Sequence, residues 1–354
     1  PFYPSALADG GYDVDDYRNV DPKLGTLKDF DRMVKALHKE NISVIVDIVP
    51  NHSSNQHLWF KEAIASAPGS KARDRYIFRD GRGKNGEIPP TDLPSHFVPN
   101  AWTRTTNPDG TPGQWYLHLF APEQPDFNWD NREVQEDFLK TLRFWSDRGV
   151  DGFRIDVAHA LKKDFKRLLT SKKDNVDGFK IPQNGTDVLF DRNEVHEIYR
   201  EWRKVFNEYN PPKFAVAEAY VQAKRRMLYA RPDELGQAFN FDLLGAAYDA
   251  KDFKRIITEN LKLAKSEGSS STWVFNNHDR VRHATRFGLP KNVDLRMWLL
   301  SDGKSVKLDR ELGLQRARAA TLMLLALPGC TYLYQGEELG LFEVEDLKLS
   351  LIHI

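Results

Sequence analysis

Four carboxylates follow runs of apolar residues that the sequence predicts to be β-strands. They are Asp47, Asp156, Glu218 and Asp279. The C-terminal ends of parallel strands meet at one mouth of a β/α barrel, where active sites are built, so these side chains are expected to converge. Two carboxyl groups facing each other across such a mouth can protonate a glycosidic oxygen and attack the sugar carbon. That is the minimum equipment for cleaving a glycosidic bond.

Arg154 precedes Asp156 by two residues, so both side chains leave the same face of a strand. An adjacent guanidinium is expected to hold Asp156 ionised, as a nucleophile requires. An isolated Arg-x-Asp is more simply explained as a structural ion pair at a strand end. The catalytic interpretation therefore depends on the other carboxylates.

The elements that must position these residues alternate between amphipathic helices and short β-branched runs, which predicts an α/β fold with a parallel sheet. In the first unit, Thr26 and Asp29 form a capping-box-like helix start. A strand over residues 42–49 follows, and we expect it to be buried on both faces because it is nearly all apolar. The apolar helical face consists of Phe30, Met33, Val34 and Leu37.

Two further units repeat this plan. One helix ends near Gly149 before a strand over residues 152–157, and the next helix leads into a strand over residues 213–218. Their apolar stripes are Val134, Phe138, Leu142 and Trp145 in the first, and Val195, Ile198, Trp202 and Val205 in the second. Later strands are expected over residues 238–242, 272–276 and 331–334.

Residues 52–129 interrupt this alternation with a stretch rich in Gly, Pro, Asn and Asp. It is too long for an ordinary connection, so we interpret it as a small domain inserted over one end of the sheet. The barrel would then comprise residues 1–51 and 130–348.

The 354-residue chain has 51 basic and 51 acidic residues. This balance gives no field that would gather nucleic acid or a membrane surface, so a neutral substrate such as a sugar is expected. No apolar run approaches the roughly 20 residues of a membrane helix. Cys330 is alone, so no internal disulfide can form, and both observations favour a cytoplasmic location.

Four segments resemble, in order, the four motifs of the α-amylase family of glycoside hydrolases. They are residues 47–52 (DIVPNH), 152–156 (GFRID), 217–219 (AEA) and 277–279 (NHD). Residues 124–129 (QPDFNW) are similar to an extra motif of the branch that contains oligo-1,6-glucosidases and α-glucosidases, and the likeness is closest to bacterial intracellular α-glucosidases. The resemblance implies a (β/α)8 TIM barrel, of which this chain would hold about six strands, with the insert after the third.

The resemblance also implies a retaining mechanism. Asp156 would be the nucleophile that forms a covalent glucosyl intermediate, Glu218 the general acid/base, and Asp279 the carboxylate that stabilises the distorted sugar. The first two carboxyl groups should then lie about 5 to 5.5 Å apart, and Glu218 should have the raised pKa of an acid beside negative neighbours.

Around these carboxylates the resemblance assigns contacts to the sugar. Asp9, His52 and His278 would bind glucose hydroxyls, and Tyr12 and Phe120 would stack on the apolar face of the ring. Both aromatic residues fit core packing near a strand end almost as well. Arg154 would line the site, while Asp47 would support Arg154 without taking part in the chemistry.

Val157, directly after the proposed nucleophile, bears on the linkage. Related enzymes with Val at this position tend to prefer α-1,4 links, and those with Thr tend to prefer α-1,6 links. Maltose and short malto-oligosaccharides are therefore the expected substrates. One methyl-for-hydroxyl difference changes such contacts by only about 1 to 3 kcal/mol.

Two alternatives remain open. An oligo-1,6-glucosidase, a sucrose isomerase or a transglucosidase of the same branch would use the same carboxylates. A non-catalytic relative, such as the heavy subunit of an amino-acid transporter, would keep the barrel as a binding module. The presence of Asp156, Glu218 and Asp279 together argues against it.

Family members have further segments on both sides of the region matched here, including an N-terminal segment with an acidic calcium loop. We therefore expect no metal or cofactor within these residues, even if the longer protein binds calcium. Residues 349–354 resemble a translated sequencing-library adapter, and we expect them to lie outside the fold.

Overall fold

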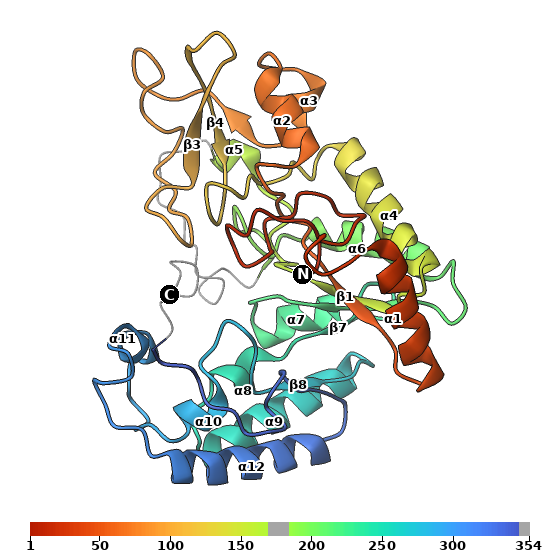
Figure 1. The fold of residues 1–354 in the computed structure, drawn as a ribbon, viewed down its shortest axis with the longest axis vertical. Coiled ribbons are helices and arrows are strands. Elements are labelled where there is room, and N and C mark those ends of the chain that lie inside the picture. The colour runs from red at the N-terminus through yellow and green to blue at the C-terminus, as the bar shows by residue number, and fades with distance from the viewer. Residues whose placement is uncertain (169–183, 347–354) are drawn as a thin grey trace. The chain divides into compact units, whose positions relative to one another are not determined.

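The computed structural model describes residues 1–168 and 184–346. The chain forms two compact units, Pro1–Gly236 and Gln237–Ile354 (Figure 1). Within the described ranges, no helix is both long enough and apolar enough to cross a membrane.

Parallel strands form the centre of the first unit. They are β1 (Ile45–Ile48), β5 (Gly152–Ile155) and β6 (Phe214–Ala217), and β7 (Gly236–Ala238), the next strand in the order, begins at the last residue of this unit. β1 pairs with β5, and β5 with β6, in parallel, and Ile48, Ile155 and Ala217 stand side by side. The residues that follow β5 and β6, Asp156 and Glu218, therefore emerge at the same edge of the sheet.

Three amphipathic helices accompany this sheet: α1 (Leu27–Lys39), α4 (Arg132–Asp147) and α6 (Val195–Phe206). The predicted capping box at Thr26 and Asp29 is present. The predicted apolar stripes of α4 and α6 are buried along their whole length, as the helical period predicts. In α1, Phe30 and Val34 are buried as predicted. Met33, which was predicted on the same face, is 44% exposed.

The strand predicted over residues 42–49 is shorter and less buried than expected. β1 covers only Ile45–Ile48, and Ile45 is 39% exposed while Val46 and Ile48 are buried. Asp47, on the same face as Ile45, is also only partly buried, so burial on both faces was wrong for this strand.

Residues 52–129 contain α2 (Leu58–Ala65), α3 (Lys71–Asp74) and an antiparallel sheet, seen together at the top of Figure 1. The strands of this sheet lie in the order β2 (Phe78–Arg79), β4 (Pro112–Leu117) and β3 (Trp102–Thr106). They pair in antiparallel fashion, whereas β1, β5 and β6 pair in parallel. Separate domain boundaries at 52 and 129 stay a prediction. Two short helices, α5 (Phe165–Leu168) and α7 (Ala223–Tyr229), follow β5 and β6.

The second unit combines helices with a parallel pair of strands, β8 (Thr272–Val274) and β9 (Cys330–Tyr332). Its helices are α8 (Phe241–Gly245), α9 (Ala250–Ser266), α10 (His283–Arg286), α11 (Leu295–Leu300) and α12 (Arg310–Ala326). Trp273, Phe275, Phe253 and Leu324 contribute to its core.

Three predicted elements in this region need correction. The strand expected over residues 272–276 is β8, which ends at Val274. The strand expected over residues 238–242 ends at Ala238, because Asn240 caps α8 by accepting a hydrogen bond from the Asp242 backbone. The strand expected over residues 331–334 is β9, which ends at Tyr332. The predicted terminal segment 349–354 lies outside the described residues.

Candidate active site

Arg154 is the centre of the candidate site in the first unit. Its Nη1 lies 2.8 Å from Asp47 Oδ2 and 2.7 Å from Asp156 Oδ1, and its Nη2 lies 2.7 Å from Glu218 Oε2. One guanidinium thus contacts three carboxyl groups from the ends of β1, β5 and β6. The predicted support of Arg154 by Asp47 is present in this geometry.

Burial and neighbouring charge act together on this cluster. Asp156 and Glu218 are each 5% exposed. Burial raises the pKa of Asp156 well above its ordinary value, Arg154 opposes this, and the nearby Glu218 and Asp47 carboxyls raise it further. Burial works against the charge of Arg154, but the surrounding carboxyls outweigh it and raise the pKa of Arg154.

Arg154 lowers the pKa of Asp156, as expected, but burial and the nearby Glu218 and Asp47 carboxyls outweigh this effect, so the pKa is raised overall. The interaction between the Asp156 and Glu218 side chains also raises the pKa of Asp156. Neighbouring carboxyls that act on each other's pKa are typical of acid/base sites.

The turn after β5 wraps around Glu218. The Val157 amide donates to Glu218 Oε2 at 3.1 Å, and the Ala158 amide donates to the Glu218 carbonyl at 2.8 Å. The Glu218 amide in turn donates to the Ile155 carbonyl at 2.9 Å. The backbone of the proposed nucleophile's turn therefore fixes the orientation of the proposed acid.

Several predicted sugar-binding residues gather beside this cluster. Gln124 Nε2 donates to Asp9 Oδ2 at 2.7 Å and lies 3.0 Å from His52 Nε2. The Tyr12 hydroxyl donates to Asp47 Oδ2 at 3.0 Å, and the Phe120 ring centroid lies 5.2 Å from that of His52. Burial lowers the pKa of His52 to about 3, so this ring is neutral at physiological pH.

The loop that carries Asp9 is held by Asp13, whose role the sequence did not reveal. Asp13 is fully buried and accepts hydrogen bonds from the Ser5 hydroxyl at 2.8 Å and from the Ala8 and Asp9 amides at 3.0 Å. A carboxylate that closes a loop onto its own amides fixes the backbone. Asp13 therefore positions Asp9.

Lys163 is a second residue that the sequence did not single out. Its Nζ lies 3.1 Å from Asp126 Oδ2 and donates to Asn51 Oδ1 at 3.0 Å. Asn51 and Asp126 belong to the segments 47–52 and 124–129, so Lys163 ties the two motifs together. In the sequence, the adjacent pair Lys162 and Lys163 resembles an ordinary solvated surface.

The remaining predicted residues, His278 and Asp279, belong to the second unit. They follow β8, their side chains are exposed, and His278 Nε2 lies 3.4 Å from Asp279 Oδ1. Their approach to Asp156 and Glu218 stays a prediction. In the residues described, no group of three or more His, Cys, Asp or Glu side chains is arranged to hold a metal ion.

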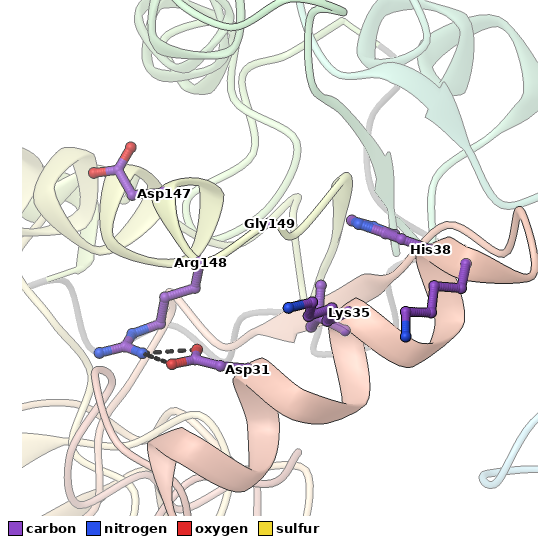
Figure 2. Close-up of a pocket in the computed structure, with 8 residues that line it drawn as sticks. Asp31, Lys35, His38, Asp147, Arg148 and Gly149 are labelled. Atoms are coloured by element: carbon purple, nitrogen blue, oxygen red, sulfur yellow. Dashed lines mark hydrogen bonds and ion pairs between the residues drawn. The ribbon is translucent and has the colours of Figure 1, made fainter.

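A surface depression of about 670 Å³ (Figure 2) is lined by none of the residues of the carboxylate cluster. It lies between α1 and the end of α4, and Asp31 and Arg148 form an ion pair across it at 2.8 Å. His38 is also engaged, because its Nε2 lies 2.8 Å from Asp151. With these groups already paired within the chain, the depression offers no chemistry comparable to that around Arg154.

Comparisons with known proteins show to which family this chain belongs. The alpha-amylase catalytic domain matches residues 1–351. The alpha-glucosidase of Apis mellifera is 32% identical over 96% of this chain and 55% of its own length. The oligo-1,6-glucosidase of Parageobacillus thermoglucosidasius is 33% identical over 97% of this chain and 58% of its own length.

A solved structure supports the same conclusion. The trehalulose synthase of Pseudomonas mesoacidophila is 29% identical, with a TM-score of 0.78 over 97% of this chain and 58% of that protein. The chain thus spans a little over half the length of the relatives it matches, and the predicted barrel fold class is confirmed. The chain belongs to the alpha-amylase family of glycoside hydrolases, whose catalytic domain it matches.

Proposed function

We propose that the protein containing this chain is a retaining α-glucosidase that releases terminal α-1,4-linked glucose from maltose and short malto-oligosaccharides. The observation that carries the proposal is the placement of Asp156 and Glu218 at the ends of adjacent strands, in contact with the same guanidinium. Relatives named alpha-glucosidase and oligo-1,6-glucosidase support the substrate class.

The placement of the two carboxyls favours retention over inversion. An inverting pair must stand about 6.5 to 9.5 Å apart to admit a water, whereas a retaining pair stands about 5 to 5.5 Å apart. Asp156 Oδ1 and Glu218 Oε2 each lie 2.7 Å from a terminal nitrogen of the same guanidinium, which supports the shorter separation.

The reaction proceeds in two steps. Asp156 bonds to the anomeric carbon while the glycosidic C–O bond breaks and the Glu218 proton passes to the leaving oxygen. Glu218 then takes a proton from water, and the water oxygen displaces Asp156 from the sugar. Asp279 stabilises the positive charge that develops on the ring, and Asp9, His52 and His278 bind its hydroxyls.

The residues proposed to contact the substrate differ in the neighbours that hold them in place. Asp9 and His52 are held together by Gln124, which favours a fixed hydroxyl-binding pair. Phe120 stacks against His96 with centroids 4.9 Å apart, so it meets the sugar with its edge or with its remaining face. Val157 is half-buried beside the pair, in keeping with a contact to the linkage.

The test uses the full-length protein that carries this chain. Wild type, Asp156→Asn and Glu218→Gln are compared on maltose, isomaltose and p-nitrophenyl α-glucoside, with the anomer of released glucose followed by NMR. We expect α-glucose from wild type, loss of activity in Asp156→Asn, and a preference for maltose over isomaltose. The matched controls are Asp31→Asn and Glu208→Gln, whose carboxylates form exposed ion pairs.

Other results of this experiment would each indicate a different function. Faster cleavage of isomaltose indicates an oligo-1,6-glucosidase. Conversion of sucrose or transfer to a second sugar indicates an isomerase or transglucosidase. A folded wild type that cleaves no α-glucoside indicates a binding module.

A further inference from the structure

Val157 has an unusual backbone conformation. Its φ is +44°, in the left-handed region, although it is a β-branched residue. A β-branched side chain is a genuine outlier there, and such strain persists only where surrounding contacts impose it.

The contacts that impose it are visible in the structure. The Val157 carbonyl accepts from the Ala160 amide at 3.0 Å, and the Ala158 amide donates to the Glu218 carbonyl at 2.8 Å. The buried Tyr199 hydroxyl of α6 donates to the Ala158 carbonyl. The turn is therefore held by three hydrogen bonds at the Val157 carbonyl and at Ala158.

The consequence of the strain is the direction of one N–H group. The Val157 amide points at Glu218 Oε2, where Arg154 Nη2 also donates. Two donors occupy this oxygen, so the acid proton is left to Oε1. When Glu218 gives up that proton, the carboxylate charge develops next to a donor that is already in place.

We propose that Val157 is a positioning residue whose strained backbone holds its amide as a fixed donor to the Glu218 carboxylate, promoting proton release to the leaving group. This role belongs to the backbone and is separate from any contact of the Val157 side chain with the linkage. The inference rests on the proposed function, because it requires Glu218 to be the general acid.

The decisive experiment replaces the Val157 amide with an ester, by introducing 2-hydroxyisovaleric acid at position 157 of the full-length protein. This keeps the side chain and deletes the donor. A hydrogen bond to the ionised form lowers a pKa, so the basic limb of the kcat/KM profile should move to higher pH by about one unit. The kcat should fall about tenfold on methyl α-glucoside and much less on p-nitrophenyl α-glucoside, whose leaving group needs little acid assistance.

The same amide-to-ester change at Ala158 is the matched control. It deletes a hydrogen bond to the Glu218 carbonyl and leaves the carboxylate donor intact, so the basic limb should not move. Val157→Gly keeps the N–H and accepts the same φ, so it should also leave the basic limb in place. An unmoved limb in the Val157 ester, or an equal shift in Val157→Gly, would overturn the proposal.

Two further variants keep the result interpretable. Glu218→Gln must show the same leaving-group dependence; if it does not, the proposed function itself fails. If Glu218→Gln shows it and the Val157 ester does not, only the positioning role fails. Should the ester variant not fold, Tyr199→Phe removes the support of the turn, and an unchanged ratio of methyl to p-nitrophenyl glucoside cleavage would count against the proposal.

Discussion

Lys163 Nζ lies 3.1 Å from Asp126 Oδ2, and neither side chain has solvent-exposed area. Burial lowers the pKa of Lys163 and raises the pKa of Asp126, and each residue partly offsets the shift of the other. Two charges that are both destabilised by burial depend on one another. The pair joins the loop after β5 to the segment that follows β4.

Lys163→Met should therefore destabilise the fold strongly. The substitution leaves Asp126 buried without a cation, and breaking a buried pair in this way costs about 3 to 5 kcal/mol. Urea denaturation measures the loss. Lys162→Met is the control, because its partner Asp130 is about half exposed and such pairs contribute under about 1 kcal/mol.

The double variant Lys163→Met/Asp126→Leu completes this test. Replacing both charges with apolar groups removes the unpaired carboxylate, so much of the lost stability should return. A single Lys163→Met variant as stable as Lys162→Met would mean that the pair contributes little.

His52 should make the fold sensitive to acid. Its pKa is about 3 in the folded chain and about 6.5 in the unfolded chain. The folded value is the lower one, so unfolding takes up a proton below about pH 6.5 and stability is lost as pH falls towards 3. Each pH unit in this window costs about 1.4 kcal/mol.

The measurement is the free energy of unfolding at several pH values between 7 and 5. In His52→Gln the free energy of unfolding should fall less steeply with decreasing pH than in wild type. The difference in slope should correspond to about one proton taken up on unfolding. His278→Gln is the control, because that side chain is exposed in the second unit. Parallel curves for wild type and His52→Gln would contradict the burial of a neutral His52.

Arg154→Lys should inactivate the protein without unfolding it. A lysine presents one compact charge, whereas the guanidinium reaches Asp47, Asp156 and Glu218 from two nitrogens. Loss of one or two charge-assisted hydrogen bonds corresponds to roughly a 100-fold fall in kcat/KM. Arg148→Lys, at the exposed pair with Asp31, should retain activity, and circular dichroism checks that both variants fold.

The helices were predictable because their burial follows from local periodicity. The stripes of α4 and α6 are continuous in the sequence and buried in the structure. Strand limits were less accessible, because the extent of a strand depends on its neighbours. Asn240 was read as part of a strand, yet it caps α8, and its preference for helix N-caps was the available signal.

The cluster around Arg154 was predictable from carboxylates at strand ends, but its supporting residues were not. Tyr199 reaches the Ala158 carbonyl across 41 residues of sequence, and Lys163 reaches Asp126 from a separate segment. Such contacts depend on how elements pack, and no local pattern encodes them. The positive φ of Val157 could not be predicted either, because a glycine is the usual sequence signal for a positive φ and this position is a valine.

Gln124 provides a test of the sugar-binding assignment. Its amide nitrogen donates to Asp9 and contacts His52, while its oxygen accepts from the Ala121 amide at 3.0 Å. Gln124→Ala should release Asp9 and raise KM for maltose about tenfold, with a smaller effect on kcat, because these contacts are proposed to bind the ground-state sugar as well as the transition state. The inhibition constant of glucose should rise in parallel.

Gln135→Ala is the matched control for this substitution. Gln135 donates to the Trp129 carbonyl from α4 and contacts none of the proposed site residues named above, so KM should stay at the wild-type value. If Gln124→Ala lowers kcat and leaves KM unchanged, Gln124 acts on the chemical step, and the assignment of Asp9 and His52 to hydroxyl binding loses its support.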